Sequence, residues 1–415
     1  MEQGLKVITP SLCVRCKGRL FCGLTACPIL DKVSNARRVE ERIHGTDFSG
    51  PTPPSVFVGR HDYPNLSIGP LSTPVSVEDA DLLENPQKWF GLPQEKVIEF
   101  RQLLVNSRVK ERTGNAAHPT ELLASMQELA ISKKPVELEV ELFRRPRFHL
   151  SLNDNSAPHG PTGELKKLEL AENPKPSKHL GKAFNDSDLK ALEAVSGLYS
   201  KGVEVHRLSN ALSAGAFGVG EKRKLVPTRW SITAVDSMLS QKLVDEIKGF
   251  APIAEFELFH SNYLDNNFWV VLAPMTWAFE LIEAWFPNSN WNFGSELVVS
   301  NDFESNRGRK DYAENTAGAY YASRLGVAEY LHFEKKQAGA LVLREIGPEY
   351  KTPVGVWQVR ENVRNAMNSK PLTFASLELA LKFLDTRFKC GIERFREKSA
   401  LLREYKTQRR LFEFF

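Results

Sequence analysis

Cysteine is scarce in this 415-residue sequence, which contains five, and four of the five lie within residues 13–27. Long apolar runs are missing: no stretch of about 18 consecutive apolar residues occurs, and the most apolar segment, 268–285, is interrupted by Glu280 and Glu283. The first thirty residues also lack the apolar core of a signal peptide. These absences argue against a disulfide-stabilised secreted protein and against a membrane partner, and they predict a soluble, cytoplasmic protein.

Signatures of several common enzyme classes are missing as well. The sequence contains no H-E-x-x-H motif, no G-x-S-x-G motif and no phosphate-binding P-loop. Hydrophobic residues make up 42% and charged residues 26%, which is ordinary for a globular protein with a sizeable core. The formal net charge of +4 permits binding to nucleic acid without requiring it. Composition therefore leaves open whether the protein is an enzyme.

The chain is long enough for two or three domains, and its patterns divide it into four parts. We predict a small cysteine-rich N-terminal lobe over residues 1–48 and a mixed core over 55–370. C-terminal helices follow over 371–406, and a flexible tail occupies 407–415. The core should be α/β or α+β, because helix and strand patterns are interspersed without a repeat. A break near 150–185 would divide the core into two subdomains.

Periodicity predicts individual elements within the core. Residues 136–142 alternate apolar residues with glutamate, which is typical of a half-buried strand. A second strand is predicted at 203–207 and helices at 235–247 and 276–285, while the proline-rich segment 153–180 is predicted to be mostly loop.

The cysteine cluster has the spacing Cys13-x2-Cys16-x5-Cys22-x4-Cys27. Four thiolates can complete the tetrahedral coordination of Zn²⁺, and such a closed site is structural rather than catalytic. An iron–sulfur cluster is the alternative, because four thiolates also suit it. We therefore predict a metal-binding lobe in which Cys13, Cys16, Cys22 and Cys27 are the ligands and Zn²⁺ is the favoured ion.

The last eight residues form a second motif, Gln-Arg-Arg-Leu-Phe-Glu-Phe-Phe. Gln408, Leu411, Phe414 and Phe415 have the spacing of a peptide that docks on a DNA sliding clamp. In one turn of 3₁₀ helix Leu411 and Phe414 share a face, and Phe415 adds a third apolar side chain beside them. The tail is therefore predicted to bind a clamp, which indicates a role in DNA maintenance.

A basic segment in the core is the best candidate for ligand contact. It contains Arg223, Lys224, Thr228, Arg229, Trp230 and, further on, Ser231 and Asp236. Cations and hydroxyls can hold phosphates, and an indole can stack on a base. One hypothesis is a surface that binds DNA or a nucleotide. The alternative is the active site of a nuclease or transferase, with Arg229 and Asp236 at its centre.

Two further segments combine charged and aromatic residues. Residues 302–311 mix carboxylates with bases and could hold Mg²⁺, although such charge runs are more often solvated surface. Residues 59–63, Gly-Arg-His-Asp-Tyr, follow a short predicted strand at 55–59 and form a basic, aromatic loop.

The chain as a whole resembles the archaeal Nre family of DNA repair proteins. The resemblance rests on the cysteine cluster, the tail motif and three internal segments, 224–236, 318–325 and 353–361. It implies a metal site at the four cysteines and recruitment by the archaeal clamp PCNA through Gln408, Leu411, Phe414 and Phe415. It also implies a role in repair of DNA, with DNA as a partner and association with the nucleoid. It supplies no catalytic mechanism.

Overall fold

The computed structural model describes residues 15–16, 19–21, 27, 39–148, 159–289, 292, 294–350 and 352–407. The chain divides within the long helix α8 (Thr228–Ile247), between Leu239 and Ser240. We call the part from Ala26 to Leu239 the N-terminal unit and the part from Ser240 onward the C-terminal unit. The proline-rich stretch at which a break was predicted therefore lies inside the N-terminal unit.

A six-stranded mixed sheet forms the centre of the N-terminal unit. The strands follow one another across the sheet in the order β1-β5-β6-β4-β3-β2. Only the β4–β6 pair is parallel among these neighbours. The strand bounds are β1 Asp47–Thr52, β2 Val56–Val58, β3 Asn65–Ser72, β4 Val105–Arg112, β5 Val136–Leu142 and β6 Thr162–Leu170.

One face of this sheet carries the core of the unit. Val136, Leu138, Val140 and Leu142 of β5 are all buried, as their alternation with glutamate predicts. They pack in one cluster with apolar residues of helix α4, which begins after Thr120 because the Thr120 hydroxyl accepts a hydrogen bond from Leu123 N. The helices are α3 Gln94–Gln102, α4 Glu121–Ile131, α5 Lys178–Asn185, α6 Ala191–Tyr199 and α7 Val205–Ser213.

The C-terminal unit is built on a second six-stranded mixed sheet, with the order β11-β10-β13-β9-β8-β14. β10 and β13 are parallel, and the other neighbours are antiparallel. Two short strands, β7 (Ala251–Pro252) and β12 (Lys336–Gln337), pair separately. The main strands are β8 Phe256–Tyr263, β9 Asn266–Ala273, β10 Ala278–Trp285, β11 Val298–Glu304, β13 Gly339–Ile346 and β14 Leu372–Phe374.

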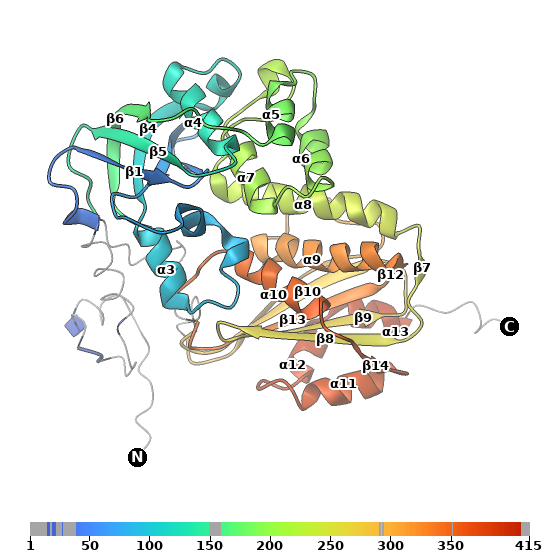
Figure 1. Ribbon diagram of the computed structural model, residues 1–415. Coiled ribbons are helices and arrows are strands. Elements are labelled where there is room, and N and C mark those ends of the chain that lie inside the picture. The colour runs from blue at the N-terminus through green and yellow to red at the C-terminus, as the bar shows by residue number, and fades with distance from the viewer. Residues whose placement is uncertain are drawn as a thin grey trace. The chain divides into compact units, whose positions relative to one another are not determined.

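Helices cover both faces of this second sheet (Figure 1). Helices α9 (Gly318–Glu334) and α10 (Trp357–Met367) pack on one face and share one apolar cluster with it. Helices α11 (Leu377–Asp385), α12 (Glu393–Lys398) and α13 (Ala400–Thr407) contribute to a second cluster on the other face. The unit is therefore a three-layer α/β/α arrangement, and the predicted mixture of helix and strand is confirmed.

Three element predictions are wrong, each for a physical reason. The segment 276–285, predicted to be a helix, contains strand β10 (Ala278–Trp285) instead, because helices cover both faces of the sheet and the expected alternation disappears. The segment 203–207, predicted to be a strand, leads into helix α7, which begins at Val205 after the turn at Gly202, whose φ is 80°. Residues 153–180 include strand β6, whose exposed side chains are charged and resemble those of a loop.

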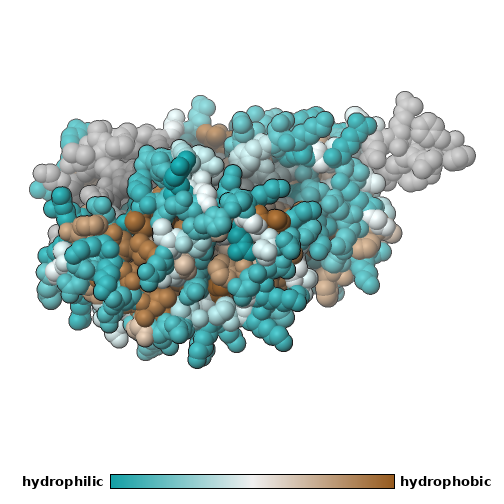
Figure 2. All heavy atoms as spheres, turned by 90° about the horizontal axis from the view of Figure 1, so that it is seen from above, coloured by the Kyte–Doolittle hydropathy of each residue, from teal (hydrophilic) through white to brown (hydrophobic). Residues whose placement is uncertain are grey.

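In the part of the chain that the structure describes, no helix has the length and apolarity needed to cross a membrane. Figure 2 shows one face of the molecule, on which hydrophilic side chains dominate and hydrophobic groups occupy limited areas.

Candidate nucleic-acid interface

The first turn of helix α8 is fixed to its neighbours by hydroxyl groups. Thr228 Oγ1 accepts a hydrogen bond from Val58 N at 2.8 Å and lies 3.1 Å from Ser213 Oγ. The Ser231 hydroxyl donates to Ser209 O at 2.6 Å. These bonds attach α8 to strand β2 and helix α7. The predicted ligand-binding hydroxyls therefore hold the helix in place.

The side chain of Arg223 also stabilises the fold. Its guanidinium donates to three backbone oxygens, Phe184 O at 2.7 Å, Asp186 O at 2.9 Å and Gly218 O at 3.0 Å. The group lies 5.6 Å from the centre of the Phe184 ring, and its partial burial lowers the pKa of Arg223. Arg223 thus fixes the glycine-containing loop before α8 to the end of α5 and is not free to hold a phosphate.

Three predicted residues of the segment, Lys224, Arg229 and Trp230, are exposed. The Trp230 side chain is 49% exposed. Trp230 lies against Tyr63, which is 58% exposed, with ring centres 6.2 Å apart and planes inclined at 37°. Tyr63 belongs to the basic, aromatic loop between β2 and β3. The structure therefore brings this loop together with the basic segment that contains Trp230, two candidates that were predicted separately.

The backbone conformation of Asp62 and an ion pair with Lys110 fix the loop that carries Tyr63. Asp62 adopts a positive φ of 66°, and Lys110 forms an ion pair with its carboxylate at 2.5 Å. This hydrogen bond with Lys110 lowers the pKa of Asp62. Arg60 and His61 of the same loop are exposed. We call the exposed set Arg60, His61, Tyr63, Arg229 and Trp230 the aromatic platform.

Asp236 lies on the same helix as Arg229 but is fully buried. Arg229 is exposed, two helical turns earlier along α8. A carboxylate without solvent access cannot act together with Arg229 on a substrate at the surface. The arrangement favours a binding surface over an active site centred on this pair.

The charged segment 302–311 belongs to the C-terminal unit, and its first two carboxylates, Asp302 and Glu304, are buried. Asp302 accepts hydrogen bonds from Thr316 N at 2.7 Å and Thr316 Oγ1 at 2.9 Å, and it pairs with Arg309 at 3.1 Å. Glu304 accepts from Arg324 Nε at 2.8 Å and Trp277 Nε1 at 2.9 Å. These protein donors occupy Asp302 and Glu304, which favours a structural network over a magnesium site, while Arg307, Lys310 and Asp311 of the same segment are exposed, as expected of a charged surface run.

The two terminal motifs fall largely outside the described residues. Cys13 and Cys22 lie outside them, as do Gln408, Leu411, Phe414 and Phe415. Cys16 is buried and Cys27 is partly buried. The Cys16 sulfur accepts a hydrogen bond from Phe21 N at 3.2 Å.

Sequence reasoning did not foresee that Tyr63 and Trp230 would meet. The hydrogen bond between Val58 and Thr228 that brings their segments together joins residues 170 positions apart. No local pattern reports such a contact. The only available signal was that both segments combine an aromatic residue with cations.

Comparison with known proteins covers nearly the whole chain. Residues 21–292 match the model of the archaeal Nre N-terminal region, and residues 304–414 match that of the archaeal Nre C-terminal region. DNA repair protein NreB of Archaeoglobus fulgidus is 37% identical over 402 residues, covering 97% of this chain and 99% of that protein. DNA repair protein NreA of Haloferax volcanii is 38% identical over 394 residues, covering 93% of each chain. No solved structure matches. This chain belongs to the archaeal Nre family.

Proposed function

We propose that this protein is a DNA repair factor that binds DNA through the aromatic platform and is recruited by the sliding clamp PCNA through its C-terminal peptide. The observation that carries the DNA-binding part is the exposed Tyr63–Trp230 pair, which stands beside Arg60, His61 and Arg229. The names of the curated relatives, which are DNA repair proteins, support the repair role. Such a factor would work at the nucleoid.

The chemistry of the platform suits single-stranded DNA. Two partly exposed aromatic rings offer faces on which bases can stack, and such stacking contributes about 1–3 kcal/mol per base. The neighbouring guanidinium groups can neutralise backbone phosphates. Stacking and phosphate contacts do not depend on the identity of the base, so binding through them should depend weakly on sequence. The Thr228 and Ser231 bonds hold Trp230 in place before any DNA arrives.

Replacement of Trp230 by alanine should weaken binding to single-stranded DNA by about 5- to 100-fold, the equivalent of one lost stacking contact. Tyr63→Ala should have a similar effect. Neither change should lower the melting temperature appreciably, because both side chains are about half exposed. Fluorescence anisotropy with a labelled oligonucleotide measures the affinity.

Phe333→Ala is the matched control, because Phe333 is an exposed aromatic residue of the C-terminal unit with 82% of its side chain accessible. It should bind DNA like the unmodified protein. Arg229→Gln should reduce the dependence of affinity on salt concentration, because one phosphate contact releases about one counterion. Unchanged affinity in both Trp230→Ala and Tyr63→Ala would contradict the platform.

We further propose that Cys13, Cys16, Cys22 and Cys27 hold one structural metal ion, with Zn²⁺ favoured over an iron–sulfur cluster. The hydrogen bond from Phe21 N to the Cys16 sulfur fits a metal thiolate. Arg19 N also donates to Cys16 O at 2.9 Å, and Leu20 has a positive φ of 60°, so a tight turn follows this cysteine. An ion bound by four thiolates would stabilise the fold of the lobe and leave no position for a substrate.

Cys16→Ser should remove the metal, because serine replaces one of the four thiolates. Elemental analysis of the purified protein should find about one zinc ion per chain before the change and little afterwards. Cys390→Ser is the control, since Cys390 lies far from the cluster in the sequence and should leave the metal content unchanged. Detection of iron together with visible absorbance would indicate an iron–sulfur cluster instead of zinc. A metal-free protein would refute the site.

A further inference from the structure

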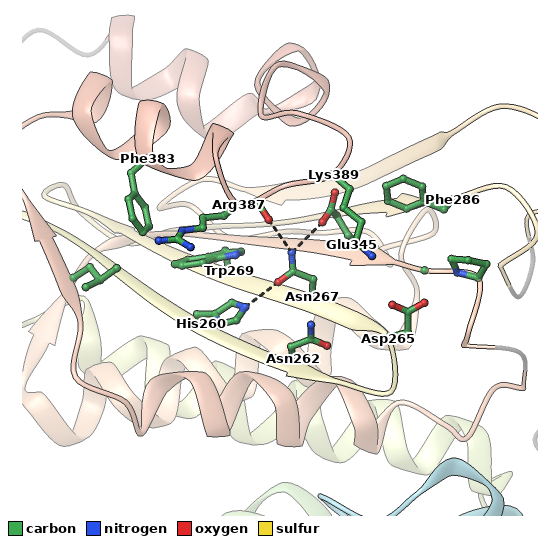
Figure 3. Close-up of a pocket in the computed structure, with 13 residues that line it drawn as sticks. His260, Asn262, Asp265, Asn267, Trp269, Phe286, Glu345, Phe383, Arg387 and Lys389 are labelled. Atoms are coloured by element: carbon green, nitrogen blue, oxygen red, sulfur yellow. Dashed lines mark hydrogen bonds between the residues drawn. The ribbon is translucent and has the colours of Figure 1, made fainter.

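The C-terminal unit contains a cavity of about 530 Å³ that the aromatic platform does not use. It lies beside strands β8, β9 and β13, next to the segment between α11 and α12 (Figure 3). Its size is within the range of small-molecule sites, about 300–1,000 Å³. It is lined by aromatic side chains (Trp269, Phe286, Phe383), amides (Asn262, Asn267), ionisable groups (His260, Asp265, Glu345, Arg387, Lys389) and Gly347, Pro348 and Leu372.

Stacked rings form one wall of the cavity. The His260 and Trp269 rings lie 4.4 Å apart and are inclined at 30°, while Phe383 meets Trp269 edge-on at 5.7 Å. Trp269 is buried, whereas His260 is exposed. The outer face of the imidazole can therefore receive another planar ring, as aromatic side chains receive nucleobases.

The orientation of His260 is fixed by a chain of hydrogen bonds. His260 Nε2 lies 2.9 Å from Asn267 Oδ1, and Asn267 Nδ2 donates to Glu345 Oε2 at 2.9 Å (Figure 3). The other carboxylate oxygen of Glu345 accepts from Cys390 N at 2.9 Å. Because Asn267 donates to a carboxylate, its oxygen faces the imidazole, and Nε2 carries a proton. These hydrogen bonds thus fix the orientation of the imidazole ring before a ligand binds.

Three hydrogen-bond donors at this cavity are uncommitted. Trp269 Nε1 is buried and has no hydrogen-bond partner among the described residues, which is costly unless an acceptor is supplied. Arg387 and Lys389 are exposed and pair with no carboxylate of the described chain. Arg387 stacks over the Phe383 ring at 4.8 Å, which leaves its N–H edge available. Donors of this kind bind an anion.

The opposite end of the cavity offers acceptors. Asp265 adopts a positive φ of 51° and accepts a hydrogen bond from Glu349 N at 2.9 Å through Oδ2. Gly347 gives this carboxylate room, because a Cβ at Gly347 would lie 1.9 Å from Asp265 Oδ2. The second carboxylate oxygen can accept from the hydroxyl of a sugar or the amino group of a base. The cavity therefore combines a ring face, cations and an acceptor.

We propose that this cavity binds a nucleotide, with its base against His260 and its phosphate at one of the two cations, Arg387 or Lys389, which lie on either side of Asn267 (Figure 3). The nucleotide is either a free deoxynucleotide or the 5′-phosphorylated end of a DNA strand, since both present the same groups. The proposal is independent of the aromatic platform, which belongs to the other unit.

Calorimetric titration of the full chain with dAMP, deoxyadenosine and inorganic phosphate tests the site. dAMP should bind at least about tenfold more tightly than either fragment, because only dAMP engages the ring and a cation together. Arg387→Gln combined with Lys389→Gln should weaken dAMP binding about tenfold or more. Both residues are exposed, so the fold should persist. His260→Ala should reduce dAMP affinity toward that of phosphate.

Two controls distinguish this site from others. Lys382→Gln removes an exposed lysine of α11 outside the cavity and should have no effect. Trp230→Ala should leave dAMP binding unchanged, which separates failure of this site from failure of the platform. Absence of saturable dAMP binding, or equal affinity in the Arg387 and Lys389 double variant, would overturn the proposal. Competition between dAMP and a 5′-phosphorylated oligonucleotide then shows which of the two ligands the site prefers. If the oligonucleotide displaces dAMP at a concentration lower than that of dAMP, the natural ligand is a strand end.

Discussion

A chain shortened to end at Thr407 should lose detectable binding to the sliding clamp and keep its affinity for single-stranded DNA. The removed residues include Leu411, Phe414 and Phe415, the three apolar side chains that would fill the clamp pocket. A short peptide loses conformational entropy when it docks, so its affinity should be modest, on the order of micromolar. With the apolar anchors removed, little binding energy remains.

The fold should tolerate this truncation, because the preceding helix has its own attachment. The buried carboxylate of Glu280 accepts hydrogen bonds from Ser399 Oγ at 2.6 Å, Ala400 N at 2.9 Å and Leu401 N at 3.0 Å. These bonds satisfy the N-terminus of α13, and Leu401 packs in the core. Helix α13 ends at Thr407, one residue before the peptide begins.

Calorimetry of the clamp with the whole chain, the shortened chain and a synthetic peptide of residues 408–415 measures the effect. The peptide should bind alone. Phe414→Ala should weaken binding more than Gln408→Ala, because the phenyl ring buries more apolar area. Trp230→Ala serves as the reciprocal control: it should lose DNA affinity and bind the clamp normally. Full-strength clamp binding by the shortened chain would refute the assignment.

Secondary structure was predictable from the sequence where one side of an element faces solvent. Strand β5 shows this, because its glutamates alternate with buried valine and leucine. Strand β10 shows the opposite case: all eight of its residues are buried, and Glu280 and Glu283 stand three positions apart, which imitates a helix. In a strand this spacing places the two carboxylates on opposite faces, and each has buried partners there. Those partners lie far away in sequence, so no local pattern could reveal them.

Only those parts of the candidate site that have a local sequence pattern were predictable. Trp230 and the basic loop at Tyr63 were found because each combines aromatic and charged residues locally. Their contact depends on the packing of α8 against β2 and could not be foreseen. Arg223 looked like a phosphate ligand, but three backbone oxygens bind it, and backbone acceptors leave no trace in a sequence. The cavity beside His260 is assembled from five separate segments and gave no sequence signal.

The second large effect concerns the buried ion pair between Glu283 of β10 and Arg344 of β13. The two residues are register partners on parallel strands, and both are almost fully buried. Arg344 also donates to Asn266 Oδ1 through Nε at 2.9 Å and Nη2 at 2.6 Å. Its guanidinium lies 5.4 Å from the centres of both the Phe268 and Trp285 rings. The positive charge of Arg344 therefore has its buried counterion only while Glu283 is present.

Glu283→Ala should reduce the free energy of unfolding by about 3–5 kcal/mol, because it leaves a buried cation without its counterion. Arg344→Met should cost less. Burial raises the pKa of Glu283 and the charge of Arg344 opposes that shift, so Glu283 can become neutral when the arginine is gone. An arginine side chain cannot become neutral in this way, because the guanidinium group keeps its charge in proteins. Methionine can also fill the space between the two aromatic rings.

Glu141→Ala provides the matched comparison, because Glu141 pairs with Lys166 across neighbouring strands at 2.6 Å with both side chains accessible. An accessible pair contributes about 0–1 kcal/mol, so this variant should unfold almost like the original. Scanning calorimetry of the three variants measures the order of their stabilities. If Glu283→Ala were no more harmful than Glu141→Ala, Glu283 would not be the counterion of Arg344. If Arg344→Met were the more harmful change, the argument that Glu283 can become neutral while Arg344 cannot would be wrong.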